Sequence, residues 1–375
     1  DVLWLTDAGG RRSGVYFRLW KLAPDLSSYE LYQSGRAAVR TNQPAALAEY
    51  EAAIGGFVGN TAWGLLRDAG PPLERGGDGS AELKFLETAE LETRQFIRGS
   101  EWAWRTRRPD LMADYFSLAD DLDHSWLGLV SREVPGNDPA ISARIGALRS
   151  RGWALVDRRL AALLALAREA NALFVLGGDH GMRPSWRFFH VNTALRMAGL
   201  LAANDSGRTD LTRTRAVSPS GYYINVNRIG RKGGIVPADQ VEWVADSVIA
   251  VLRSARSPEG TPIVTGAWRP EPNDTLGRGG PTGGDVYFAL APGYYYGSQL
   301  NDSITSARAP SGSHGYPSIE RDMYTVLCAS GPGVGGRRLP TARVIDAAPT
   351  VSAWLGIPSP ADARGVSLLE AMRSR

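Results

Sequence analysis

The stretch ALFVLGGDHGM, residues 172–182, guides the interpretation of the whole chain. Its five apolar residues at 172–176 predict a buried strand. Two glycines end this strand, and Asp179 and His180 follow side by side before Gly181. Open α/β sheets place their chemistry just past the carboxyl ends of central strands. A carboxylate next to an imidazole suits a divalent metal, so the stretch predicts a metal site; a polar turn capped by Asp179 is the simpler alternative.

The composition is typical of a soluble globular protein, with 375 residues, 43% of them hydrophobic, and a net charge of +3. The longest apolar run, residues 160–167, is much shorter than the roughly 20 residues that cross a bilayer. The basic residues are scattered, which argues against binding to a nucleic-acid duplex. The single cysteine, Cys328, excludes an internal disulfide and a cysteine-based zinc site, and its apolar neighbours predict a buried thiol.

Strands and helices are predicted from hydrophobic periodicity and from turn residues. In the first part of the chain we expect strands at 2–5, 15–20 and 29–32, and helices at 45–53 and 81–98. In the second part we expect strands at 111–118, 172–176, 222–227, 262–268, 286–290 and 323–329, and helices at 141–169, 192–201, 238–253 and 349–355. This alternation indicates a layered α/β core over residues 106–375. Residues 1–105, strand-rich and then helical, are expected to form a smaller subdomain that contacts the substrate.

The chain has four histidines, and three of them lie beside glycine or carboxylate, where we expect loops at strand ends. His124 ends the sequence DDLDH, in which Asp120 is four positions earlier; on a helical turn the two side chains would share a face and could share a metal. His314 lies in the glycine-flanked sequence GSHGY, residues 312–316. His190 has apolar neighbours, which favours a structural role.

Five candidate ligands therefore emerge, and they are Asp120, His124, Asp179, His180 and His314. A catalytic zinc has about three protein ligands and an open position, so a two-metal site needs roughly six. Histidine and carboxylate without thiolate fit zinc or manganese. We therefore expect two divalent metal ions, either zinc or manganese.

The order of these motifs resembles the alkaline phosphatase superfamily, and within it the type I phosphodiesterase/nucleotide pyrophosphatase group and its bacterial phosphohydrolase relatives. Residues 189–201 and 346–358 resemble further segments of that group. The resemblance implies a layered α/β/α core and hydrolysis of a small phosphate ester or nucleotide. It also implies that both ions are zinc, that Asp120, His124 and His314 hold one of them, and that Asp179 and His180 hold the other.

One departure concerns the nucleophile. The family begins with a strand ending in Asp-Gly, and its threonine or serine nucleophile follows before a middle region that residues 15–64 resemble. We find no such segment, so the nucleophile is expected to lie outside this chain, and activity of the chain alone stays open. A rival assignment makes Asp7 the missing ligand and Thr41 the nucleophile.

Other functions stay open beside this one. A phosphomutase of the same superfamily would use a similar set of ligands, whereas a sulfatase needs a modified cysteine or serine that the chain does not show. A metal-binding remnant without turnover and a non-enzymatic binding module are further alternatives. Many relatives are exported, so the resemblance implies an extracytoplasmic location in a bacterium. The sequence predicts no oligomeric state.

Overall fold

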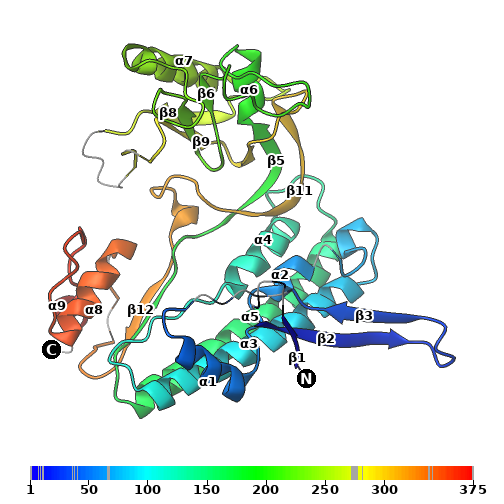
Figure 1. The fold of residues 1–375 in the computed structure, drawn as a ribbon, viewed down its shortest axis with the longest axis vertical. Coiled ribbons are helices and arrows are strands. Elements are labelled where there is room, and N and C mark those ends of the chain that lie inside the picture. The colour runs from blue at the N-terminus through cyan, green and yellow to red at the C-terminus, as the bar shows by residue number, and fades with distance from the viewer. Residues whose placement is uncertain are drawn as a thin grey trace. The chain divides into compact units, whose positions relative to one another are not determined.

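The computed structural model describes residues 2–373 except 7, 9, 11, 36, 38, 40, 66–67, 272–277, 281, 337 and 340 (Figure 1). The fold is mixed α/β, which confirms the predicted fold class. The chain forms two compact units. The first unit comprises Asp1–Leu122, Asp138–Gly178 and Val326–Arg375, and the second comprises Asp123–Asn137 and Asp179–Thr325. The division into residues 1–105 and 106–375, with a substrate-contacting role for the former, stays a prediction.

The first unit begins with a three-stranded sheet formed by the strands predicted at 2–5, 15–20 and 29–32. Strands β1 (Val2–Thr6), β2 (Arg12–Leu22) and β3 (Tyr29–Gln33) are antiparallel in the order β1-β2-β3. Trp20 and Tyr32 stack with ring centroids 5.0 Å apart, and both pack against a small apolar cluster that contains Leu65 and Ala81. This contact joins the sheet to the helices that follow.

Two long helices, α3 (Ser80–Arg107) and α5 (Pro139–Glu169), pack against each other in the first unit (Figure 1). Helix α5 begins at Asp138, whose carboxylate accepts hydrogen bonds from the backbone N–H groups of Ala140 and Ile141. The helices predicted at 45–53, 81–98 and 141–169 are confirmed. The shorter helices are α1 (Pro44–Ile54), α2 (Thr61–Leu65) and η1 (Leu73–Arg75).

The strand predicted at 111–118 is wrong, because residues 111–117 form no regular element and helix α4 (Leu118–Val130) begins there. Leu111 and Tyr115 are 56% and 66% exposed, so the apolar residues of this segment do not face a sheet. Helical periodicity sets in at Leu118, since Leu118, Leu122 and Trp126 are buried at intervals of four. His124 therefore lies inside a helix rather than in the expected loop at a strand end.

Strand β4 (Phe174–Gly177) carries the apolar run that was expected to be a buried central strand. It is half-buried instead, and among the described residues its one partner is the antiparallel strand β12 (Leu327–Ser330). Burial alternates along β12 and leaves Cys328 exposed, so the prediction of a buried thiol is wrong. The remaining elements of the first unit are η4 (Val344–Asp346), α8 (Ala347–Leu355) and α9 (Leu369–Met372).

The second unit is built around a four-stranded antiparallel sheet in the order β6-β7-β9-β8. Its apolar core includes the buried face of α7, on which Val244, Val248 and Leu252 recur at intervals of four. The elements are β6 (Ala216–Val217), β7 (Tyr223–Val226), β8 (Val264–Trp268), β9 (Val286–Leu290), α6 (Val191–Met197), η2 (Ala238–Gln240), α7 (Val241–Ser254) and η3 (Arg321–Met323).

A second sheet of this unit contains β5 (Arg183–His190) between β10 (Gly293–Gly297) and β11 (Thr305–Ser313). Strand β10 runs parallel to β5, and β11 runs antiparallel with Ser313 opposite Arg183. The first residue of β5 therefore lies beside the last residue of β11.

No helix in the described part of the chain is both long enough and apolar enough to span a membrane.

Gly152 in α5 lies against Leu122, which is fully buried in α4, and a Cβ at this glycine would overlap the leucine side chain. We expect Gly152→Ala to lower the free energy of unfolding by about 1–3 kcal/mol, because the new methyl group would overlap the buried Leu122 side chain in a closely packed interior. Urea unfolding measures this difference.

Gly146→Ala is the matched control, since Gly146 lies in the same helix and a Cβ there meets nothing within 4 Å. This control should stabilise the protein by about 0.5–1 kcal/mol. Equal stabilisation by both substitutions would contradict the packing described here.

Candidate metal centre

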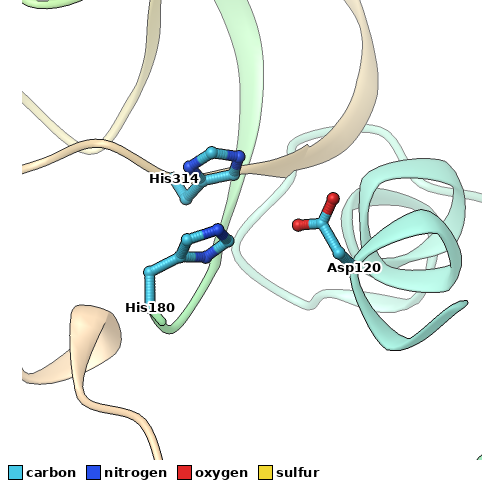
Figure 2. Close-up of side chains that lie close together, drawn as sticks. All are labelled: Asp120, His180 and His314. Carbon is cyan, nitrogen blue, oxygen red and sulfur yellow. The ribbon is translucent and has the colours of Figure 1, made fainter. Parts of the chain in front are cut away.

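The pairing of β5 with β11 brings two of the predicted ligands together. His180 lies three positions before the start of β5, and His314 directly follows the end of β11. Their imidazole rings stack with centroids 3.7 Å apart and an interplanar angle of 11° (Figure 2). The ring of His124 meets that of His314 edge-on at 5.0 Å. Three of the four histidines thus form one cluster in the second unit.

Backbone carbonyls orient two rings of this cluster. The Nδ1 atom of His124 lies 2.9 Å from the carbonyl oxygen of Gly312, and the Nδ1 atom of His180 lies 3.0 Å from that of Gly181. A carbonyl oxygen can only accept, so Nδ1 carries the proton in each ring. In the neutral imidazole the lone pair then lies on Nε2, and this tautomer is the one in which Nε2 can bind a metal.

The two predicted carboxylates differ in their surroundings. Asp179 is 64% exposed, and its Oδ2 lies 3.6 Å from Nε2 of His180. Asp120 lies on α4 one turn before His124. His180 and His314, both in the second unit, offer ring nitrogens that could hold a metal ion (Figure 2).

The glycines of these motifs allow close backbone approaches. A Cβ at Gly312 would overlap the backbone carbonyl of Asp123 and the sulfur of Met182. A Cβ at Gly181 would overlap the carbonyl oxygens of Asp322 and Tyr324. The glycines are therefore required by the contacts that hold the histidine cluster together.

His190 has the structural role that its sequence neighbours predicted. It is 6% exposed, its Nε2 donates to the hydroxyl of Ser306 over 2.7 Å, and its Nδ1 accepts from the Asn301 amide over 2.9 Å. Burial lowers the pKa of His190, which favours the neutral ring that this pair of hydrogen bonds needs.

The rival nucleophile, Thr41, has a local structural contact. Its hydroxyl accepts a hydrogen bond from the backbone N–H of Gln43 over 2.9 Å, just before α1 begins. Such a contact is typical of a residue that shapes a turn at a helix start. Asp7, the rival ligand, lies outside the described residues.

Sequence reasoning missed a cavity of about 470 Å³ in the second unit. Its walls include Tyr222, Tyr295, Tyr296 and Tyr316, and His314 also lines it. Burial raises the pKa values of Tyr222 and Tyr295, so these hydroxyl groups stay uncharged at neutral pH. The sequence signal for this cavity is the run GYYYG at 293–297.

Comparison with known proteins adds a second line of evidence. The family model of type I phosphodiesterase/nucleotide pyrophosphatase matches residues 3–317. The chain belongs to this family. It is a family of phosphoric ester hydrolases within the alkaline phosphatase superfamily, so the resemblance seen in the motifs is confirmed. The family generally uses divalent metals and acts on small phosphate esters or nucleotides. A search among curated proteins found no match.

The close approach at Gly312 gives a testable expectation for this family member. Gly312→Ala should cost about 1–3 kcal/mol in the free energy of unfolding, because the new methyl group meets the backbone carbonyl of Asp123 as well as the sulfur of Met182, and the backbone cannot rotate away as a side chain can. Gly177→Ala serves as the control, since a Cβ there meets only Leu327 at 3.9 Å. Thermal unfolding of the two variants should separate them, and equal midpoints would contradict the contact.

Proposed function

We propose that this chain is a metal-dependent hydrolase of phosphate esters, with two divalent ions held by Asp120, His124, Asp179, His180 and His314. The observation that carries the proposal is the histidine cluster, in which His124 and His180 donate from Nδ1 to backbone carbonyls. Metal-ligating histidines are held in this way in proteins, because the second hydrogen bond fixes the tautomer and the ring orientation.

The donor set fits the proposed ions. Imidazole nitrogens and carboxylate oxygens without a thiolate suit zinc, and manganese is the alternative. We assign Asp120, His124 and His314 to one ion and Asp179 and His180 to the other. Bound divalent ions would supply positive charge to the oxygens of a phosphoryl group. The protein contributes the fixed orientation of its rings, so little reorganisation is needed when the substrate binds.

The tyrosine-lined cavity supports a small substrate. Its volume of about 470 Å³ falls within the roughly 300–1,000 Å³ range of small-molecule sites. Because His314 lines it, a group bound there would lie next to the histidine cluster. Its neutral tyrosine hydroxyls would not repel the negative charge of a phosphate ester. We therefore propose that the cavity binds the organic group of the phosphate ester, whereas the phosphoryl group lies at the histidine cluster.

Metal content tests the assignment directly. We expect the purified chain to hold about two equivalents of zinc or manganese. One ion takes about three protein ligands, so the five proposed ligands are too many for a single ion. His314→Ala should lose at least one equivalent in elemental analysis and should lose hydrolysis of bis(p-nitrophenyl) phosphate.

His190→Gln is the control, because His190 lies in the same unit but bonds only to Ser306 and Asn301 through its ring nitrogens. Its metal content should match that of the unchanged chain. Absence of bound metal from the unchanged chain would contradict the proposal, and bound metal without hydrolysis would limit it to metal binding.

The cavity gives a separate expectation. Tyr296→Leu removes an aromatic face from the wall and should raise KM for an aryl phosphodiester roughly tenfold, since stacking on an aromatic side chain contributes ~1–3 kcal/mol. The value of kcat should change little. Tyr324→Leu, at a tyrosine that is 64% exposed and outside the cavity wall, should leave both constants unchanged. An equal KM for the two variants would rule out this use of the cavity.

A further inference from the structure

Arg308 lies in an irregular part of β11, close to the histidine cluster along the chain. The pairing of β11 with β5 shifts between Ala307, which faces Arg187, and Ser311, which faces Ser185. Between these two pairs β11 advances by four residues while β5 advances by two, so β11 contains extra residues that have no partner on β5. Arg308 lies in this bulged segment. Such bulges redirect a side chain out of the regular alternation.

The redirected side chain binds two buried hydroxyl groups. Nη1 of Arg308 donates to the hydroxyl of Ser185 and, over 2.7 Å, to that of Ser313. The two hydroxyl oxygens lie 2.7 Å apart, and both serines are fully buried. The three side chains thus join β5 to the last residue of β11. The next residue is His314.

No carboxylate among the described residues forms an ion pair with Arg308, and burial lowers the pKa of its guanidinium. The faces of Tyr295 and Phe188 lie 4.6 Å and 5.4 Å from the guanidinium carbon and offer partial compensation. Burying half of a charged side chain without a carboxylate partner costs free energy. A neutral side chain could donate the same hydrogen bonds to the two serines at a lower cost. This cost indicates a role beyond packing.

We propose that Arg308 is a positioning residue that fixes the His314 imidazole against His180 by holding the Ser313 hydroxyl. The inference rests on the proposed function, in which His314 binds a metal ion. Residues that orient metal ligands in this way typically change metal affinity 10–100-fold when they are replaced. Arg308 itself contacts neither His314 nor His180 in the described hydrogen bonds, so its effect passes through Ser313.

The test measures the zinc dissociation constant by competition with a chromogenic chelator, for the full chain. Arg308→Met removes the hydrogen bonds and keeps much of the side-chain volume, and we expect zinc to bind about tenfold more weakly. Ser313→Ala should weaken zinc binding by a similar factor. The double variant should be no weaker than either single one, because both changes break the same link. In Arg308→Ala, added guanidinium at low millimolar concentration should restore affinity, whereas equal sodium chloride should not.

Arg187→Met is the matched control. Arg187 also lies on β5, but its guanidinium donates to Glu259 and Tyr294 rather than to Ser185 or Ser313. This variant should keep the zinc affinity of the unchanged chain even if its unfolding midpoint falls. Unchanged zinc affinity in Arg308→Met and Ser313→Ala, with the unchanged chain binding zinc, would overturn the inference alone. Failure of the unchanged chain to bind zinc would overturn the proposed function and this inference together.

Discussion

The antiparallel pairing of β5 with β11 is the constraint on which the candidate site depends. Ser313 lies opposite Arg183, so the segment before β5 and the segment after β11 meet at one edge of the sheet. His180 and His314 come from these two segments, and their rings stack because the strands fix the distance between them. The same edge supplies the Gly312 carbonyl that orients His124. A single strand register therefore sets the positions of three imidazole rings.

Close packing of backbone against backbone supports this arrangement. Gly312 and Gly181 lie where a methyl group would overlap neighbouring backbone atoms. The aromatic cavity extends from the same region, because His314 and Tyr316 both line it. The chain therefore places a polar cluster and a largely aromatic cavity next to each other, which is the arrangement typical of small-molecule sites. Most of the residues that line the cavity are glycine or tyrosine.

Much of this could be predicted from the sequence, because strongly periodic segments report their own structure. The helices α3 and α5 and the strand before Asp179 were predicted from local patterns, and the motif order indicated the family, whereas strand β5 after His180 was not predicted. The segment at 111–118 was misassigned, since alternation of apolar residues does not reveal whether a partner strand exists. The exposure of Cys328 depends on which face of β12 is covered, and this is a tertiary property. The link between Arg308 and Ser185 joins positions 123 apart, so no local pattern could indicate it.

The long separation between paired segments has a consequence for biosynthesis. Ser185 and Ser313 are 128 positions apart, and His124 and Gly312 are 188 apart. At a synthesis rate of about 5–20 residues per second, several seconds or more pass between the emergence of β5 and that of β11. During that time β5 has neither of its neighbours, since β10 also comes later in the chain. The growing chain therefore exposes two unpaired strand edges, a state prone to aggregation, and it can assemble the histidine cluster only after most of the protein has been made.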